Sequence, residues 1–227
     1  MGKIILRVQA DSYSEYETIA GFRLMLNGGF CTVNWGDGTT TTHHAEGEEQ
    51  HIRHIYPKEC LETEKTFVIT ISSDEDNIVG ISINDEFTYM DVKDIDISGC
   101  QSLKYFGSTS AHFNLNGNPG IKAIDLMETD CTSINFSNST GLENLNIQDF
   151  KGKQLDLTKC NKLEYLACYC NSELTDILVS DDSAMKTLIY EMTPLSDSSL
   201  DRLRKVINRN GGEIRKLETD DNETENN

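Results

Sequence analysis

A repeat of about 21 residues occupies positions 94–190 of this chain and restricts the possible folds more than any other feature. The repeat has apolar residues at positions 1, 3, 9, 12 and 14, with one exception at Ser108, and a small or polar residue at position 6. The copies begin at Ile95, Phe113, Ile134, Leu155 and Ile177. Of the 25 positions expected to be apolar, 24 are apolar, whereas a chain that is 37% hydrophobic would supply about nine by chance. This agreement establishes the register of the repeat.

The apolar spacing predicts a short strand, a turn at the small residue and a second short strand in every copy. A unit this short cannot bury its apolar edge alone, so neighbouring copies are expected to stack and share one core. An asparagine at position 6 can hydrogen-bond the backbone of the adjacent coil, and a cysteine fills the same space as a small apolar group. The register predicts one buried column of Leu145, Leu166 and Leu188. The position 6 residues are Cys100, Asn118, Ser139, Cys160 and Asp182.

The repeat resembles the leucine-rich repeat, whose pattern includes L-x-L-x-x-N/C. The segment VKDIDISGCQSL carries this pattern, and KQLDLTKCNKLEYLACYC carries it nearly as well. The resemblance covers about 100 residues and implies a solenoid that binds proteins through its outward strand residues. Only four to eight residues connect one copy to the next, so the longer helical segment of the family is missing. We therefore expect a thin solenoid of short strands and turns.

Residues 1–88 contain strand-like stretches separated by turn residues, among them KIILRVQA, FRLMLNGG and TFVITISSD. The order of Trp35-Gly36-Asp37-Gly38, a loop, His54-x-Tyr56 and a strand at 67–71 resembles the polycystic-kidney-disease (PKD) domain. This resemblance implies an immunoglobulin-like β-sandwich with Trp35 and Tyr56 as core and corner residues. We expect the Asp37 side chain to bond the backbone two residues further on. The family's Gly-x-Tyr before the last strand is replaced here by Glu64-Lys65-Thr66-Phe67.

The fold class predicted for the whole chain is mostly β, in four parts. These are a PKD-like β-sandwich at 1–88, a solenoid of five leucine-rich repeats at 89–195, a capping helix at 196–212 and a disordered acidic tail at 213–227. Segment 81–92 is similar to a degenerate first repeat. No hinge rich in Pro, Gly or Ser separates the sandwich from the solenoid, so we expect the two to pack rigidly.

Residues 196–210 show a helical pattern with Leu200, Leu203, Val206 and Ile207 on one face. The open end of a solenoid needs a cover, so this helix is expected to cap the last repeat. Its other face is basic, and we interpret it as a solvated helix face. The basic residues are Arg202, Arg204, Lys205 and Arg209.

The 227 residues carry a net charge of −18, with acidic residues in excess in both large parts. Such a surface repels phosphate groups, so we expect no nucleic-acid partner and no binding to anionic membranes. No apolar run is long enough to span a membrane, and we expect no membrane insertion. The first residues, MGKIILRVQADSYSEYE, are not a secretory signal, which predicts a cytoplasmic location if the chain is complete. Proteins that pair a sandwich of this kind with such repeats resemble bacterial cell-surface proteins of adhesion or host interaction. This resemblance implies a cell-surface or secreted location instead.

Motifs for catalysis are missing: the chain has no G-x-S-x-G, no phosphate-binding glycine loop, no H-E-x-x-H and no paired C-x-x-C. We predict that the protein is not an enzyme and needs no cofactor. Its seven cysteines, including Cys168 and Cys170, are interpreted as buried free thiols. A metal site is the alternative for a histidine-rich window, although its histidine spacing suits zinc only on a helix. That window contains His43, His44, His51 and His54 with Glu46, Glu48 and Glu49.

We predict a non-catalytic, monomeric protein-binding module that uses the outward residues of the repeat strands. Aromatic residues interleaved with charged ones are typical of protein contact surfaces. The alternative is a carbohydrate-binding accessory protein acting through the β-sandwich. That alternative requires exposed aromatic residues, and the single tryptophan is already assigned to the core. The predicted binding residues are Lys104, Tyr105, Lys122, Asp125, Glu143, Asn144, Asn146, Glu164, Tyr165, Lys186 and Thr187.

Overall fold

The computed structural model describes residues 1–10, 18–45, 49–83, 90–110 and 112–218, and the fold is mostly β. One sheet has six strands, in the order β10 (Phe113–Asn114), β8 (Asp91–Gly99), β1 (Gly2–Gln9), β6 (Thr66–Ser73), β3 (Phe30–Asn34) and β4 (Thr40–His44). A second sheet, the long sheet, has nine strands. Their order is β17 (Glu213–Lys216), β16 (Thr187–Glu191), β14 (Tyr165–Tyr169), β12 (Asn144–Gln148), β11 (Ala123–Leu126), β9 (Tyr105–Ser108), β7 (Ile78–Ile83), β2 (Ile19–Leu26) and β5 (Gln50–Ile55).

The remaining elements are few. Strands β13 (Gln154–Asp156) and β15 (Asp176–Leu178) form a separate parallel pair. A 3₁₀ helix, η1, spans Lys58–Thr63, and the α-helix α1 spans Asp197–Arg209.

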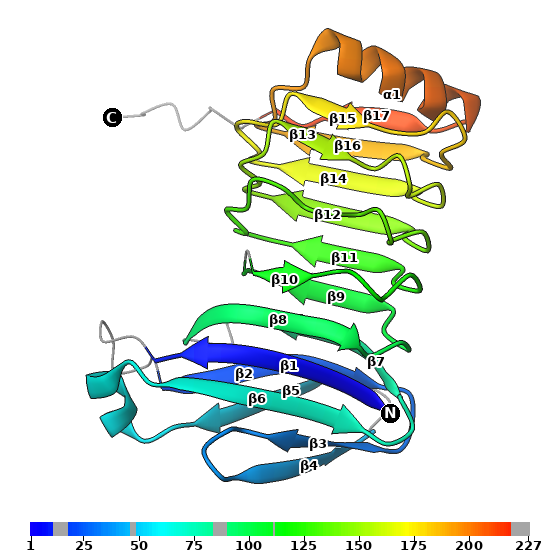
Figure 1. The fold of residues 1–227 in the computed structure, drawn as a ribbon. Helices are drawn as coiled ribbons and strands as arrows, with labels where there is room; N and C mark the ends of the chain where they lie inside the picture. The colour runs from blue at the N-terminus through cyan, green and yellow to red at the C-terminus, as the bar shows by residue number, and fades with distance from the viewer. Residues whose placement is uncertain (11–17, 46–48, 84–89, 111, 219–227) are drawn as a thin grey trace, which may run out of the picture.

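The repeat region forms a β-solenoid of about six turns, which rises above the N-terminal half in Figure 1. Strands β9, β11, β12, β14 and β16 are parallel neighbours in the long sheet. The predicted register is confirmed, because Leu145 pairs with Leu166 and Leu166 pairs with Leu188. All three side chains are fully buried. They belong to one column of the shared core.

The long sheet continues from the solenoid into the N-terminal half of the chain (Figure 1). Strand β7 pairs in parallel with β9 and antiparallel with β2. Strand β8 pairs antiparallel with β1 and in parallel with β10. The two halves are therefore hydrogen-bonded through both sheets rather than joined by a linker alone. Part of the predicted degenerate repeat, residues 84–89, lies outside the described residues.

The core of the N-terminal half combines apolar residues from both sheets. Trp35 is fully buried and stacks on Phe22, with ring centroids 5.8 Å apart. The Tyr56 hydroxyl donates a hydrogen bond to Trp35 O at 2.7 Å. Asp37 Oδ1 accepts a hydrogen bond from Thr39 N at 2.9 Å, as expected two residues further on. Trp35 and Tyr56 are thus core residues, while the assignment to an immunoglobulin-like sandwich stays a prediction.

The small residues at position 6 tie each coil to the previous one. Asn118 Nδ2 donates to Cys100 O at 2.6 Å. Cys100 Sγ lies 3.4 Å from Ile78 O, and Cys160 Sγ lies 3.8 Å from Phe136 O. These contacts confirm the predicted roles of asparagine and cysteine. All seven cysteines are free, but the prediction that they are buried is wrong for Cys131 and Cys170, which are only partly buried. Burial raises the pKa of the Cys100 thiol to about 11 and that of Cys160 to about 12.

The fifth copy departs from the predicted pattern at this turn. Ser183, not Asp182, is the buried small residue, and Ser183 N bonds Ser180 O at 3.1 Å. Asp182 is exposed. Burying its carboxylate without a partner would cost several kcal/mol, so the turn forms one residue later and places a hydroxyl inside.

Ser139, the position 6 residue of the third copy, is buried without a complete set of hydrogen bonds. It is 1% exposed, and its Oγ has no hydrogen-bond partner among the described residues. We expect Ser139→Cys to raise the free energy of unfolding by about 1 kcal/mol, because the thiol tolerates burial without a hydrogen bond. Asn118→Ala is the comparison and should lower it by about 1–3 kcal/mol, since Cys100 O loses its donor. Urea denaturation measures both. A loss of stability in Ser139→Cys would show that the hydroxyl is satisfied in solution.

Two further sets of polar contacts were not predicted from the sequence: one recurs in four copies, called the first ladder below, and the other is made by Asn171. At position 2 of four copies, an Asx side chain accepts a hydrogen bond from the backbone N–H two residues on, at 2.9–3.0 Å. These residues are Asp96, Asn114, Asn135 and Asp156. At the opposite corner, buried Asn171 accepts from Phe150 N at 2.9 Å and donates to Ile147 O at 3.1 Å. The first ladder is visible in the sequence as an Asp or Asn between the two apolar residues.

Helix α1 buries its predicted apolar face at the end of the solenoid (Figure 1). Leu200, Leu203, Val206 and Ile207 are all buried. Ser196 is the N-cap and accepts from Ser199 N at 3.2 Å. The helix contacts β15 and β17.

The prediction of a disordered tail from residue 213 is wrong for its first residues. Strand β17 extends the long sheet by pairing in parallel with β16. Ile214 lies opposite Leu188 and packs against the core, so it continues the leucine column by one turn. The turn into β17 needs Gly212, because a Cβ there would lie 1.8 Å from Lys186 O. Residues 219–227 lie outside the described residues.

The basic residues of α1 are also not a purely solvated face. Arg202 pairs with Asp176, and its Nε donates to Ile177 O at 3.3 Å. Arg209 donates through Nη2 to Ser183 O at 2.9 Å. Arg202 and Arg209 thus bind carbonyl groups of the last coil, which spacing within the helix could not reveal.

Candidate functional site

The side chains that point away from the core along the repeat strands form one face of the long sheet, called the outer face below. Strands place successive side chains on opposite sides, so these residues alternate with the buried leucines. The first outward row contains Tyr105, Ala123, Asn144, Tyr165 and Thr187, which pair in register. The second row contains Gly107, Asp125, Asn146, Ala167 and Ile189.

The eleven predicted binding residues divide between this face and its border. Six of them, Tyr105, Asp125, Asn144, Asn146, Tyr165 and Thr187, lie in the two outward rows. The other five, Lys104, Lys122, Glu143, Glu164 and Lys186, each precede a strand by one residue and form the border. The structure therefore brings the predicted residues together on one side of the solenoid.

The border residues are largely engaged with one another. Lys122 pairs with Glu143, and Lys186 Nζ lies 2.9 Å from Glu164 Oε2. Lys104 Nζ lies 3.4 Å from Gly120 O. Exposed pairs of this kind contribute about 0–1 kcal/mol each. The two pairs neutralise four of the five border residues, so Lys104 is the border charge that these pairs leave uncompensated.

The tyrosines of the outer face lie beside very small residues. A Cβ added to Gly107 would lie 2.8 Å from the Tyr105 hydroxyl and 2.8 Å from Ser82 Oγ. The Tyr105 side chain therefore extends along its own strand over Gly107. Ala167 is only 1% exposed although it points outward, and it lies between Tyr165 and Tyr169 on β14. Gly107 and Ala167 thus leave room for aromatic rings along the sheet.

Asp125 and Asn146 form the polar centre of the face. Asn146 Nδ2 donates to Asp125 Oδ1 at 2.8 Å. Burial raises the pKa of the Asp125 carboxyl above its usual value, and the hydrogen bond from Asn146 opposes that effect. Asn146 Oδ1 is shielded from water and has no donor among the described residues. Asp125 and Asn146, on adjacent strands, therefore each have a side-chain oxygen that accepts no hydrogen bond from the described residues.

Sequence reasoning missed several members of this face. Gly107, Gln148, Ala167 and Tyr169 all belong to it by alternation along their strands. The signal that could have found Gln148 and Tyr169 is the two-residue alternation of each strand, extended past position 14 of the repeat. The role of glycine and alanine was not visible, because it depends on which side chains lie above them.

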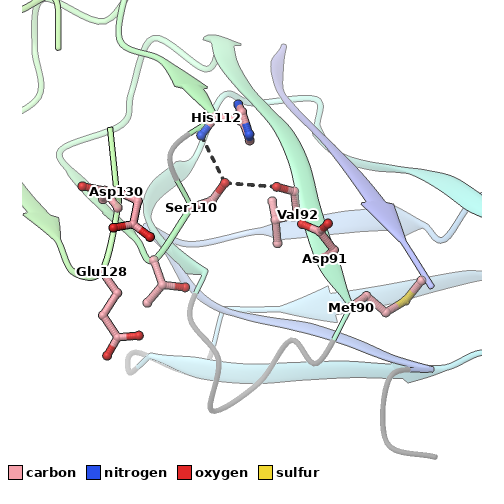
Figure 2. A pocket seen from close by; sticks show the side chains of 9 residues that line it. Met90, Asp91, Val92, Ser110, His112, Glu128 and Asp130 are labelled. Atoms are coloured by element: carbon pink, nitrogen blue, oxygen red, sulfur yellow. Dashed lines mark hydrogen bonds between the residues drawn. The ribbon is translucent and has the colours of Figure 1, made fainter. Parts of the chain in front are cut away.

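A pocket of about 270 Å³ lies at the start of β8, away from the predicted residues (Figure 2). Its walls include Asp91, His112, Glu128 and Asp130. Ser110 Oγ is already engaged, since it donates to Val92 O at 3.1 Å and accepts from His112 N at 3.2 Å. Among the described residues, no group of three or more His, Cys, Asp and Glu side chains could hold a metal ion.

The histidine-rich window is split by the fold. His43 and His44 lie on β4 of the six-stranded sheet, whereas His51 and His54 lie on β5 of the long sheet. Glu46 and Glu48 are outside the described residues. His54 stacks on Trp35 at 4.8 Å, and its Nε2 lies 2.7 Å from Asp37 Oδ2. The Asp37–His54 pair thus lies against the core of the N-terminal half.

Asp37 makes stability depend on pH. Burial alone would raise the pKa of its carboxyl, but hydrogen bonds from Thr39 and His54 outweigh this and lower the pKa from 3.8 to about 2. A depressed pKa in the folded state gives stability that is present above pH 4 and is lost as the pH falls towards 2. We expect Asp37→Asn to lose about 2 kcal/mol at pH 7 and to approach the wild type near pH 2. Urea denaturation between pH 2 and 7 measures this difference, and a difference independent of pH would contradict it.

Comparison with protein-family models, with curated proteins and with solved structures finds no match to this chain. None of the described residues forms a helix long and apolar enough to cross a membrane. Conclusions about function therefore depend on the geometry of the outer face.

Proposed function

We propose that the chain is a non-catalytic protein-binding module that uses the outer face of the long sheet. The observation that most supports this proposal is the amino-acid composition of that face. Its two central rows contain tyrosine, asparagine, threonine, small residues and one isoleucine, with one acidic side chain, Asp125, in a chain whose net charge is −18. Tyrosines with amide side chains on a firmly paired scaffold are typical of protein contact surfaces.

The proposal includes a finer architecture. The N-terminal half is a PKD-like β-sandwich, the solenoid is a compact variant of the leucine-rich repeat, and α1 caps its end. The fully buried Trp35 supports the sandwich, and the four buried residues of α1 support the cap. By this resemblance, the protein acts in adhesion or host interaction at a bacterial cell surface.

Carbohydrate binding through the sandwich is less well supported. Trp35, the single tryptophan, is fully buried and could not stack on a sugar ring. Phe30 is about half exposed in the N-terminal half, but it packs against His44 with ring centroids 5.7 Å apart.

The experiment compares two matched variants in an affinity capture from bacterial and host lysates. Asn144→Arg places a long charged side chain at an exposed position of the outer face. Val68→Arg places the same side chain on β6 of the six-stranded sheet, where Val68 is 44% exposed. A protein captured by the wild type and by Val68→Arg, but not by Asn144→Arg, supports the proposal. Equal capture by both variants overturns it.

A further inference from the structure

Asp125 and Asn146 lie in one row of the outer face, on strands about 4.8 Å apart. Their only mutual hydrogen bond joins Asn146 Nδ2 to Asp125 Oδ1. This leaves Asp125 Oδ2 without a hydrogen bond, and Asn146 Oδ1 without a donor, among the described residues. Asn146 Oδ1 is shielded from solvent and out of reach of a ligand, so the partly buried carboxylate of Asp125 is the acceptor that favours a ligand bringing N–H or O–H groups.

The neighbouring side chains do not supply those donors. The flanking positions in the row are Gly107 and Ala167, which have no polar side-chain atoms. The Tyr105 hydroxyl is directed along its strand towards Ser82, over Gly107. Asp125 forms no ion pair within the described part of the chain. Burial, rather than a nearby cation, has the largest effect on the pKa of its carboxyl, and raises it.

Basic side chains further along the same row have acidic partners. Arg23 lies 3.5 Å from Glu49, and Arg215 pairs with Glu213. Lys122, which precedes β11 at the border, pairs with Glu143. The acidic centre of the face is therefore left for a cation from outside the chain.

We propose that the outer face receives an arginine side chain of a basic protein segment at the Asp125–Asn146 pair, a proposal that rests on the protein-binding function above. The planar guanidinium presents several N–H donors in a fixed fork, which matches the two oxygens of the Asp125 carboxylate. Of these, Oδ2 has no hydrogen bond among the described residues. The Tyr105 ring in the neighbouring row offers a surface against which the guanidinium packs. The net charge of −18 attracts a basic segment and disfavours an acidic one.

A glycan is the other class of ligand that donates hydrogen bonds. Its hydroxyl groups could also donate hydrogen bonds to the Asp125 carboxylate. A neutral sugar chain would gain nothing from the net negative charge of the chain, so the charge distribution favours the arginine.

The test is an NMR titration of the full-length, isotope-labelled protein at low ionic strength. The probes are acetyl-Gly-Gly-Arg-Gly-Gly-amide, the same peptide with citrulline in place of arginine, and maltohexaose. We expect the arginine peptide to shift the backbone amides of β9, β11 and β12, and the citrulline peptide to bind more weakly. Shifts spread over other acidic regions, or shifts at these strands from maltohexaose alone, would overturn the proposal.

Matched variants separate a specific site from general attraction to an acidic protein. Asp125→Asn removes one charge at the pair, and Asp182→Asn removes one charge from an exposed turn. We expect at least about a tenfold loss of arginine-peptide affinity in Asp125→Asn and little change in Asp182→Asn. Equal losses would reject the site. A melting curve of each variant confirms that it is folded.

The capture and titration experiments together distinguish failure of the arginine site from failure of the proposed protein-binding function. If Asn144→Arg abolishes capture of a protein partner while the arginine peptide does not bind, the outer face is a protein-binding surface of different chemistry. If capture is unaffected by Asn144→Arg but the peptide binds at Asp125, the arginine site exists and the captured partner binds elsewhere on the protein.

Discussion

Leu166→Asp is expected to lower the free energy of unfolding by at least about 4 kcal/mol. Leu166 is fully buried between Leu145 and Leu188 in consecutive turns. Aspartate there leaves an ionised group without a partner in the shared core and removes the packing of both neighbours. Because the turns stack, the damage reaches the coils on either side, and we expect cooperative unfolding of the solenoid at a lower urea concentration.

Lys162→Asp is the matched control, since it introduces the same residue at an exposed position of the same copy. Its free energy of unfolding should stay within about 0.5 kcal/mol of the wild type. Circular dichroism during urea denaturation follows both variants. An unchanged midpoint for Leu166→Asp would mean that the column of leucines is not the core of the solenoid.

The register of this column was predictable because a repeat tests each position several times. Five independent copies agree on the positions of Ile95, Leu103 and Phe106 and their equivalents, so an error in one copy cannot shift the whole pattern. The predicted pairing extends to the first position of four copies, where Ile95 pairs with Phe113 and Leu155 pairs with Ile177. The prediction is wrong for the third copy, because Ile134 lies in no strand.

Features that depend on a single copy were predicted less well. Ser183 replaces Asp182 as the buried residue because a local turn moves by one position to keep a carboxylate in water. Strand β17 was missed because EIRK has only one apolar residue, Ile214, whose core position depends on the return of the chain after α1. Neither feature has a periodic pattern in the sequence.

The candidate site likewise has features that the repeat pattern predicts and features that it does not. Alternation along the strands predicts that Tyr105, Asn144 and Tyr165 point outward together, and they do. The sequence could not predict that Asp125 has no cationic partner among the described residues, since this depends on which cations find other partners. Arg215 illustrates this, because it comes from a strand expected to be disordered and pairs with Glu213 rather than with Asp125.

The C-terminal elements should be required to keep the end of the solenoid covered. We expect a chain ending at Leu195 to expose the core beside Leu188 and to aggregate. Helix α1 buries Leu200, Leu203, Val206 and Ile207, and each such side chain contributes about 1.5–3 kcal/mol before the entropy of ordering the helix is subtracted.

Two shorter truncations separate the helix from β17. A chain ending at Gly212 keeps α1 but removes β17, and it should lose a few kcal/mol because β16 becomes an unpaired edge and Leu188 loses Ile214. A chain ending at Glu218 keeps every contact described for β17 and should melt like the wild type. The sequence alone suggested that nothing after residue 212 contributes to stability, and the pairing of β17 overturns that expectation.

Light scattering and urea denaturation distinguish these cases. The expected order of stability is the chain ending at Glu218, then the chain ending at Gly212, then the chain ending at Leu195, with aggregation only in the last. If the chain ending at Leu195 stays monomeric with the melting curve of the wild type, α1 is not a cap. The contacts of Arg202 with Asp176 and Arg209 with Ser183 would then be too weak to hold the helix on the last coil, and the solenoid would be stable with an open end.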